Sequence, residues 1–416
     1  MLTPALVADL RAQFPALQRT HAGRPVVYLD GPAGTQVPQR VIDAISHYLS
    51  HHNANHGGLF ATSRESDQML DEAHRALADF VGASDPDEIA FGANMTSLTF
   101  ALSRALARTW QAGDEVLVTR LDHDANFSPW ALAARDAGAT LKIADVKRED
   151  GTLDVDHLLS QLSPRTKLVA VGVASNSSGS INPVAQITAA AHRVGALVFL
   201  DNVHAAPHGL TDVAAWDCDF LACSAYKFFG PHVGVLWGRR RLLESLEAYK
   251  VRPAPNSLPG KWMTGTQNHE CIAGALAAVD YLADLGRRVA GRPTSSRREA
   301  LVDAYAAIGA YERELSQRLL DGLAQLPAIR VWGITDPARF HERYATVSLT
   351  HATRSPADTA TQLGEAGIFA WQGNYYALNL SEAWGREPQG MVRVGLVHYN
   401  TAEEVDRLLA ALSDLG

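Results

Sequence analysis

Residues 196–234 read ALVFLDNVHAAPHGLTDVAAWDCDFLACSAYKFFGPHVG. An apolar run at 197–200 ends at Asp201, and a second run at 220–223 is followed closely by Lys227 and a Gly-Pro loop. Short, continuous apolar runs are typical of parallel strands that are buried on both faces. The carboxyl ends of such strands meet at one edge of an open α/β sheet, where ligands bind, so we expect Asp201 and Lys227 side by side at a binding site.

An aspartate beside a lysine at a sheet edge has two interpretations. The carboxylate can hold a protonated pyridine and the amine can form an imine, which is the pairing that pyridoxal 5′-phosphate (PLP) requires of a protein. The other interpretation is a salt bridge between two surface residues at strand ends. The pair alone does not decide between them, so the rest of the chain has to be considered.

The composition is that of a globular enzyme. With 416 residues the chain is too long for one ordinary core, and about two or three domains are expected. Apolar residues make up 47% and charged residues 20%, which argues against a disordered or fibrous chain. The net charge of −8 and the absence of a run of basic residues argue against nucleic-acid binding.

No segment of the sequence predicts a membrane span or an export signal. The apolar runs are far too short to cross a membrane, and residues 1–17 read as a short amphipathic helix, unlike a secretory or transit peptide. The three cysteines, Cys218, Cys223 and Cys271, form neither a disulfide framework nor a CxxC metal pair. We therefore expect a cytoplasmic protein.

From residue 88 the chain repeats strand–loop–helix units, which predicts an α/β fold with a mostly parallel sheet covered by helices on both faces. Long helices begin near residue 274, and short strands follow from residue 329, which indicates a smaller α/β domain. The polar stretch 286–299 between the long helices is expected to be an exposed insertion. The expected domains are residues 1–25, a segment packed on the small domain; 26–275, the large cofactor-binding domain; and 276–416, the small C-terminal domain.

A phosphorylated cofactor needs an anchor for its phosphate. The chain has no GxxxxGK[ST] loop and no GxGxxG after its first sheet strand, so nucleotide and dinucleotide folds are disfavoured. The strand expected at 88–92 instead leads through Asn94, Met95 and Thr96 into a helix. The first N–H groups of that helix, with its dipole and the Thr96 hydroxyl, form a ready anion site. Ordinary N-capping is the alternative interpretation.

Three more polar residues follow expected strands. His123 could stack on a planar ring, and Asn176 and His204 could hydrogen-bond a ring hydroxyl, although each also fits an ordinary turn. His204 and His208 have the i, i+4 spacing of a metal-binding pair, but Pro207 interrupts a helix there and no third ligand has suitable spacing. No metal site is therefore expected.

Successive strand ends thus supply Thr96, His123, Asn176, Asp201 and Lys227 to one edge of one sheet. With these residues in place, the chain resembles the class V aminotransferase family of PLP enzymes (fold type I), and within it the cysteine desulfurases and their relatives. The motifs that carry the resemblance span nearly the whole chain: VVYLDGPAGTQVP (26–38), LDHDANFSPW (121–130), SNSSGSINPV (175–184), LDNVHAAPH (200–208), SAYKFFGPHVGVL (224–236), TGTQN (264–268) and RVGLVHYNTAEEVDRL (393–408).

The resemblance implies a role for each matching residue. Lys227 would bind the cofactor covalently and later move the substrate α-proton, Asp201 would keep the pyridine nitrogen protonated, and His123 would stack on the ring. Arg393 would clamp the substrate carboxylate, a task suited to a bidentate guanidinium. Thr266 would reach the phosphate of a neighbouring subunit, so the resemblance implies a homodimer with shared active sites.

The full sets of site residues rest on the same resemblance. The expected catalytic residues are Lys227, His123 and Tyr376. The expected cofactor-binding residues are Lys227, Asp201, His204, Asn176, Ser224, Thr96, Met95, His123, Tyr226 and Thr266. The expected substrate-binding residues are Arg393, Asn176, His56 and Tyr375. The implied partners are a small amino-acid substrate and a second copy of the chain.

Three departures from the family pattern bear on the reaction. His204 stands where family members have glutamine, which keeps a hydrogen bond but adds a titratable group. Tyr226 stands where they have a histidine before the lysine. In FAWQGNYYALNL (369–380), Tyr375 and Tyr376 lie where cysteine desulfurases carry a nucleophilic cysteine. The three cysteines lie elsewhere in the chain, and a free cysteine in apolar sequence is usually inert.

Without a thiol at that place, the expected reaction is cleavage of a Cβ–X bond, most simply C–S, in a small α-amino acid, of the lyase or desulfinase type. Tyr375 or Tyr376 could act as a general acid or could pack the pocket rim. The alternatives are an aminotransferase, an amino-acid epimerase and a cysteine desulfurase that uses a displaced thiol. A non-catalytic binding protein of the same fold is another alternative, against which the retained Lys227, Asp201 and Arg393 argue.

Overall fold

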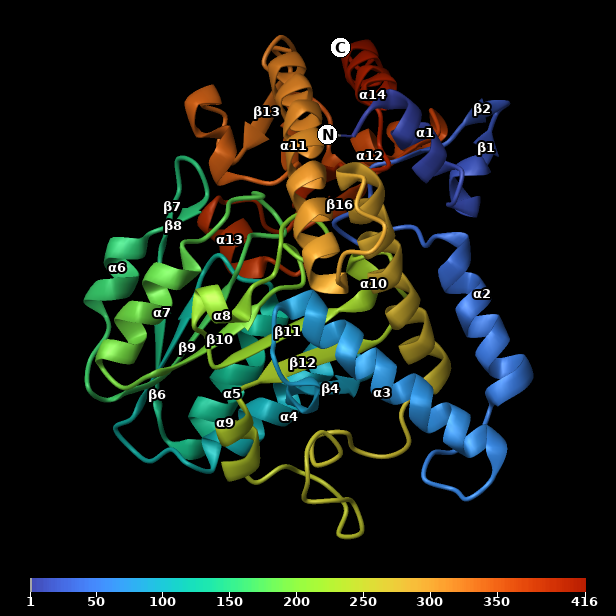
Figure 1. Ribbon diagram of the computed structural model, residues 1–416. Coiled ribbons are helices and arrows are strands. Elements are labelled where there is room, and N and C mark those ends of the chain that lie inside the picture. Colours follow the sequence, from blue (N-terminus) through green and yellow to red (C-terminus); the bar gives the residue numbers. More distant parts are fainter. Residues whose placement is uncertain (1) are drawn as a thin grey trace.

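The computed structural model describes residues 2–416, and a seven-stranded sheet lies at its centre (Figure 1). The strand order is β4 (Ile89–Gly92), β12 (Gly234–Gly238), β11 (Phe220–Ser224), β10 (Leu197–Asp201), β9 (Thr166–Gly172), β5 (Glu115–Thr119) and β6 (Thr140–Ala144). β12 is antiparallel to both of its neighbours, and the other neighbouring pairs are parallel. The predicted α/β fold with a mostly parallel sheet is confirmed.

The alternation of side chains along each strand places the two faces of the sheet in two separate cores. In β10, Val198 and Leu200 pack in one cluster of buried residues, whereas Phe199 between them packs in another. The Phe199 face is covered by α4 (Met95–Ala107) and α5 (Ser128–Ala137). The opposite face is covered by α3 (Ala61–Val81), α7 (Val184–Arg193), α10 (His269–Ala290) and α11 (Arg297–Leu323).

The C-terminal part of the chain forms a second, four-stranded antiparallel sheet. Its strand order is β13 (Ile329–Trp332), β14 (Thr346–His351), β17 (Met391–Gly395) and β16 (Trp371–Gly373). A third core joins this sheet to α12 (Pro356–Glu365), α14 (Ala402–Asp414) and the end of α11. The expected domain boundaries stay predictions; the boundary after residue 275 falls inside α10.

The N-terminal segment contacts the C-terminal part. Arg11 of α1 (Pro4–Arg11) forms an ion pair of 2.8 Å with Glu404 of α14. β3 (Val27–Tyr28) pairs in parallel with β15 (Ile368–Phe369). The first and last parts of the sequence are therefore neighbours in space, as Figure 1 shows.

The remaining elements are short or connect these layers. α2 (Gln39–His47) continues into a π-helical turn (Tyr48–His52) and packs on α10. The short helices are α6 (Val155–Ser160), α8 (Val213–Trp216), α9 (Arg240–Ser245) and α13 (Leu378–Ala383), and the two-residue strands are β1 (Thr20–His21), β2 (Arg24–Pro25), β7 (Val146–Lys147) and β8 (Thr152–Leu153). Among residues 2–416, no helix is long and apolar enough to cross a membrane.

The expected exposure of 286–299 holds for residues 291–294, but the stretch is not an insertion, because helices occupy both of its ends. α10 and α11 extend into it from both ends and leave only a short turn between them. Gly286 lets the two helices touch, because a Cβ atom there would lie 1.8 Å from the carbonyl oxygen of Ala300. Arg297 forms ion pairs with three carboxylates of α3 and α10, so its guanidinium links these helices to α11. The polar composition of the stretch gave no sign of the helix contact at Gly286 or of the ion pairs of Arg297.

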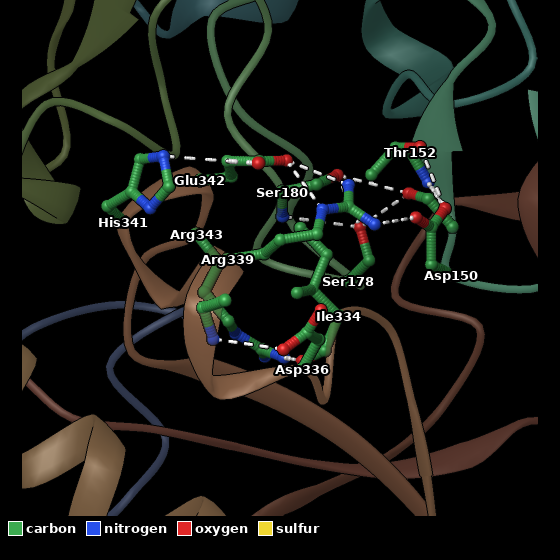
Figure 2. A network of polar contacts seen from close by, with 12 residues as sticks. Asp150, Thr152, Ser178, Ser180, Ile334, Asp336, Arg339, His341, Glu342 and Arg343 are labelled. Carbon is green, nitrogen blue, oxygen red and sulfur yellow. Dashed lines mark hydrogen bonds and ion pairs between the residues drawn. The ribbon is translucent and has the colours of Figure 1, made fainter.

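A network of polar contacts joins the C-terminal part to the loops beside the large sheet (Figure 2). Arg339 forms ion pairs of 2.6 Å with Asp150 and 2.7 Å with Glu342. The Arg343 guanidinium is buried and donates to backbone carbonyl groups of its own segment, while the backbone of Arg343 pairs with Ser180. The loop that follows β9, which carries one wall of the site described next, is thereby anchored.

The helix contact at Gly286 generates a stability prediction. Gly286→Ala should destabilise the fold by about 1–3 kcal/mol, because the added methyl group has no space between α10 and α11. Gly364→Ala in α12 is the matched control: a Cβ atom there meets no atom within 4 Å, and alanine favours a helix over glycine by about 0.5–1 kcal/mol. The thermal unfolding midpoint should fall for the first variant only. Equal midpoints in the two variants would contradict the close helix contact.

Candidate active site

A cavity of about 960 Å³ opens at the carboxyl edge of the large sheet. Its wall combines the turn before α4, the loop after β5 and the ends of β9, β10 and β11 with residues of the second sheet. The predicted site residues that line it are Met95, Thr96, His123, Asn176, Asp201, His204, Ser224, Tyr226, Lys227, Tyr375, Tyr376 and Arg393. Thr266 and His56 do not line it.

The Lys227 side chain is partly buried at the end of the turn that follows β11. Its Nζ donates to the carbonyl oxygens of Pro32 (2.5 Å) and Ala33 (3.1 Å) in an N-terminal loop. Burial and the nearby Arg393 guanidinium lower the pKa of Lys227 to about 7, whereas Asp201 acts in the opposite sense. At neutral pH a large share of the amine is therefore uncharged, as a nucleophile or a base requires.

The Asp201 carboxylate lies buried at the end of β10. Burial raises its pKa to about 6, while the Val203 N–H, which donates to Oδ1 at 2.8 Å, and the charge of Lys227 act in the opposite sense. Within the described chain this is the carboxylate's one hydrogen bond, so its second oxygen is available to a ligand. A cationic N–H group placed there would be stabilised by the carboxylate and would lower its pKa.

The start of α4 lines the cavity at the place where the sequence predicts an anion site. The Met95 N–H donates to the Ser224 hydroxyl at 2.9 Å, and Asn94 caps the helix by accepting from the N–H three residues further on, also at 2.9 Å. The N–H and hydroxyl of Thr96 have no protein partner in the described chain and line the cavity. Gly234 permits this contact between strand and helix start, because a Cβ atom there would lie 2.4 Å from Asn94.

His123 is held as a neutral ring on one wall. Its Nδ1 accepts a hydrogen bond of 3.0 Å from the Ala125 N–H, so Nδ1 carries no proton. Burial lowers the pKa of His123 to about 4, with smaller effects in the same direction from Lys227 and Arg393. The ring stacks on Tyr376 with centroids 5.4 Å apart and planes 23° apart. An uncharged flat ring of this kind suits stacking on an aromatic ligand.

Asn176, Tyr375 and Arg393 form one contact group. The side-chain amide nitrogen of Asn176 donates to the backbone carbonyl oxygen of Tyr375 at 2.9 Å. The Arg393 guanidinium donates to the backbone carbonyl oxygen of Asn176 at 2.8 Å. The guanidinium also lies over the Tyr375 ring, 4.3 Å from its centroid. Arg393 is buried and lines the cavity, and its guanidinium has further N–H groups besides the one bonded to Asn176, so a carboxylate could bind it.

The backbone places the side chains of the two adjacent tyrosines in different surroundings. Both adopt the left-handed conformation, with φ of 57° at Tyr375 and 61° at Tyr376, which is uncommon for bulky residues. The Asp124 N–H donates to the Tyr376 carbonyl oxygen at 2.7 Å and helps to hold this segment. The Tyr375 hydroxyl donates to the Met391 carbonyl group. The Tyr376 side chain is 72% exposed, and its hydroxyl has no hydrogen-bond partner among residues 2–416.

Two acids near the site, the buried Asp122 and the half-buried Asp30, escaped the sequence analysis. Asp122 accepts hydrogen bonds from Thr119 (2.5 Å) and the Gly172 N–H (2.6 Å), and burial raises its pKa to about 7. Burial raises the pKa of Asp30 to about 6, although Arg393 acts in the opposite sense. The position of Asp122 directly after a buried strand was a usable signal, whereas nothing local marks Asp30.

The two expected residues outside the cavity are exposed in the single chain. His56 lies 3.6 Å from Asp67 on the outer surface, and Thr266 lies in the segment before α10. The three cysteines also lie away from the cavity: Cys218 and Cys223 are buried, and Cys271 is in α10. Burial raises the pKa of each of these thiols.

The sequence profile of the aminotransferase class-V family matches residues 27–408. The chain belongs to this family. Among its relatives, a probable cysteine desulfurase of Vibrio cholerae is 35% identical over 97% of this chain and 96% of its own length. A cysteine desulfurase of Serratia proteamaculans is 32% identical over 98% of this chain and 97% of its own length.

Solved structures of cysteine desulfurases share the fold of this family member. The apo enzyme from Thermococcus onnurineus matches with a TM-score of 0.87 and 25% identity, covering 98% of this chain and 97% of that one. The S-sulfonic acid form of Escherichia coli CsdA matches with a TM-score of 0.84 and 28% identity, covering 98% of both chains. The predicted resemblance and fold type I are confirmed, and the chain is an enzyme of the PLP-dependent type.

The lowered pKa of Lys227 generates a pH prediction. Acetylation of this amine should reach half of its maximal rate near pH 7 and rise from low to high pH, because only the uncharged amine reacts. Brief labelling of the cofactor-free protein followed by peptide mass spectrometry measures this, with the exposed Lys147 as internal reference. Arg393→Met removes a neighbouring positive charge and should move the midpoint to higher pH. A midpoint that stays in place would contradict the coupling of the two side chains.

Proposed function

We propose that the cavity binds PLP and that the enzyme cleaves a Cβ–X bond, most simply C–S, of a small α-amino acid without a catalytic thiol of its own. One observation carries the proposal: Lys227, Asp201 and Arg393 surround a single cavity whose described lining contains no cysteine. Membership of a PLP-dependent family supports the cofactor, and the names of the relatives support a sulfur-containing substrate.

The unpartnered polar atoms of the cavity fit PLP. Asn176 Oδ1 and His204 Nε2 are buried without a partner in the described chain, and a ring hydroxyl could bond to either. The Thr96 groups at the start of α4 suit a phosphate. Buried polar atoms of this kind are costly unless a ligand completes their hydrogen bonds. The residues that would hold PLP are Lys227, Asp201, Asn176, His204, Thr96, Met95, Ser224 and Tyr226, with His123 against the ring.

The chain's own residues would perform the proton transfers. When bound, PLP draws electrons from the α-carbon of an attached amino acid, which makes the α-proton acidic. Lys227 would accept that proton at Nζ, because a large share of its amine is uncharged at neutral pH. Asp201 would accept a hydrogen bond from the ring nitrogen and keep it protonated. Arg393 would hold the substrate carboxylate through N–H groups that Asn176 does not use.

Departure of the leaving group needs a proton donor on the open side of the cavity. The Tyr376 hydroxyl is free of protein partners there, whereas the Tyr375 hydroxyl is occupied by a backbone carbonyl group. We therefore assign Tyr376 the role of general acid that protonates the departing sulfur. Tyr375 would instead support Arg393 through its ring. In this arrangement the C–S bond breaks without transfer of sulfur to a protein thiol.

Cysteine desulfurase activity is the second candidate function, because the relatives and solved structures reported above carry that name. Sulfur transfer requires a thiolate at the substrate. Cys218 and Cys223 are buried in the core on the α10 side of the sheet, and burial raises the pKa of both thiols. A displaced thiol, or one that enters from outside the chain, would therefore have to receive the sulfur.

We also propose a homodimer whose subunits share active sites, in which Thr266 and His56 would serve the partner's cavity. Large apolar side chains are exposed near both residues: Leu59 (94%) and Phe60 (57%) follow His56, and Val251 (66%) lies in the segment that leads to Thr266. Exposed apolar groups of this size favour burial against another surface. A cytoplasmic location stays a prediction.

A substrate screen tests the proposed reaction. Purified protein loaded with PLP should lose its imine absorbance with one class of amino acid, such as cysteine or cysteine sulfinate, and release product without an added keto acid. Lys227→Ala should abolish this turnover, because no amine remains to accept the proton. Dependence on a keto acid would instead identify an aminotransferase, and a persulfide on a protein cysteine would identify a desulfurase. Turnover that survives in Lys227→Ala would contradict the assignment.

The assignment of the general acid has its own test. Tyr376→Phe should lower kcat for Cβ–X cleavage by about 10²-fold or more, because the proton donor is lost while the ring remains. Tyr375→Phe is the matched comparison, since it keeps the ring against Arg393 and removes a hydroxyl that is bonded to the backbone. Steady-state kinetics of both variants should show the larger loss in Tyr376→Phe. The reverse order would assign the acid to Tyr375.

A further inference from the structure

One polar contact joins the segment that carries the two tyrosines to the turn that follows α13. The side-chain nitrogen of Asn374 donates to Glu387 Oε1 at 3.1 Å. Two glycines permit this approach, because a Cβ atom on Gly390 would lie 2.2 Å from the backbone of Gly373. The backbones of the two segments therefore touch beside Asn374, which itself lines the active cavity.

Asn374 also binds the backbone on both sides of Tyr376. Its side-chain oxygen accepts from the Tyr376 N–H at 3.1 Å, and its backbone carbonyl oxygen accepts from the N–H of the residue after Tyr376 at 2.8 Å. The carbonyl oxygen of Tyr375 accepts from the Asn176 side chain at 2.9 Å. That of Tyr376 accepts from the Asp124 N–H at 2.7 Å. Four bonds thus fix the two peptide units that flank Tyr376, and Asn374 makes two of them.

We propose that Asn374 is a positioning residue that, with Glu387, fixes the left-handed conformation of Tyr376. This conformation directs the Tyr376 ring onto His123. Glu387 sets the orientation of the Asn374 amide: the carboxylate accepts from the NH₂ group, so the amide oxygen faces the Tyr376 N–H. A left-handed backbone is unfavourable for a bulky residue and persists only where the surrounding structure over-determines it. The bonds of Asn374 supply that constraint.

The Tyr376 side chain depends on its backbone for its position. Because Tyr376 is 72% exposed, packing covers only a small part of its ring. The ring stacks on that of His123, with centroids 5.4 Å apart, and the hydroxyl has no hydrogen-bond partner among residues 2–416. A change of backbone conformation would therefore move the ring away from His123, with little other contact to hold it.

The Glu387 carboxylate is available for this purpose. It makes no ion pair within residues 2–416, and Asn374 is its one hydrogen-bond donor there. The adjacent Arg386 does not compete, because its guanidinium lies over the Trp332 ring, 4.9 Å from the centroid. Asn374 and Glu387 are both half-buried, so loss of their bond should leave the fold intact while it releases the tyrosine segment.

The consequence for catalysis rests on the proposed function, in which the Tyr376 hydroxyl protonates the departing sulfur. Proton transfer requires the donor to lie within hydrogen-bond reach of the sulfur, and a small displacement of the donor lowers the rate steeply. Asn374 would act on that step only through the position of Tyr376. The position itself does not depend on the proposed reaction and can be measured separately.

An exchange of donor and acceptor tests the contact between Asn374 and Glu387. At mildly alkaline pH, Asn374→Asp keeps the acceptor for the Tyr376 N–H but sets two carboxylates against each other, which should release the Tyr376 ring. In Asn374→Asp/Glu387→Gln, the glutamine amide can donate to the aspartate, so the arrangement should be restored. NMR of protein with labelled histidine measures both effects through the His123 signal, which is assigned by its loss in His123→Gln.

The His123 signal should respond to the neighbouring tyrosine ring. In Asn374→Asp it should move toward its position in Tyr376→Leu, which lacks an aromatic ring there, and in the double variant it should return to the wild-type position. Asn379→Asp is the matched control, because it adds the same charge to α13 outside the cavity lining. A signal that stays in place in Asn374→Asp, that remains displaced in the double variant, or that moves equally in Asn379→Asp would overturn the inference.

Steady-state kinetics give a second measurement. Asn374→Asp should lower kcat for Cβ–X cleavage by about 10-fold or more, because the proton donor is displaced. In the Tyr376→Phe background the same substitution should change kcat by less than about twofold, because the hydroxyl that it displaces is already absent. Equal losses in the two backgrounds would show that Asn374 does not act through Tyr376. Absence of Cβ–X cleavage in the wild-type protein would overturn the proposed function but leave the NMR test of the position of Tyr376 intact.

Discussion

The enclosure of two basic side chains around one cavity is the constraint on which the active site depends. Lys227 and Arg393 lie in a poorly solvated region, where two positive charges repel each other strongly. Burial lowers the pKa of Arg393 only to about 10, so the guanidinium stays charged at neutral pH. The pKa of Lys227 falls further, to about 7. The Asp201 carboxylate acts in the opposite sense and offsets part of the fall in the pKa of Lys227. One electrostatic conflict therefore yields a partly uncharged amine beside a guanidinium that stays charged.

The fold creates this conflict by bringing two sheets together. Asp201 and Lys227 come from the ends of the adjacent parallel strands β10 and β11, whereas Arg393 comes from β17 of the second sheet. A slip of one residue in the pairing of β17 would turn Arg393 to the opposite face and leave Lys227 without its charged neighbour. The anchoring of the C-terminal part at Arg339 and Arg343 is thus a condition for the chemistry as well as for stability.

The sequence predicts those features that depend only on the residues within a single strand. Buried parallel strands leave apolar runs, so the sheet, its edge and the residues Asp201 and Lys227 were predictable. Packing between distant segments was not predictable. Asp30 acquires its raised pKa from burial by segments far away in the sequence. The contact of Gly286 with α11 exists only because two helices meet. Tyr375 and Tyr376 look equivalent in sequence, and only the backbone separates them. The shared site at His56 and Thr266 stays a prediction.

The segment with the two tyrosines is where the fate of the leaving group would be decided. Holding two bulky residues in the left-handed conformation costs about 1–3 kcal/mol each, and the hydrogen bonds from Asn176 and Asp124 to their carbonyl oxygens oppose that cost. The result leaves Tyr375 packed on Arg393 and Tyr376 stacked on His123 with its hydroxyl free. A phenol is a poor acceptor of sulfur but an effective proton donor. Under the proposed reaction, the strain would keep a proton donor at the place where sulfur transfer would require a thiolate.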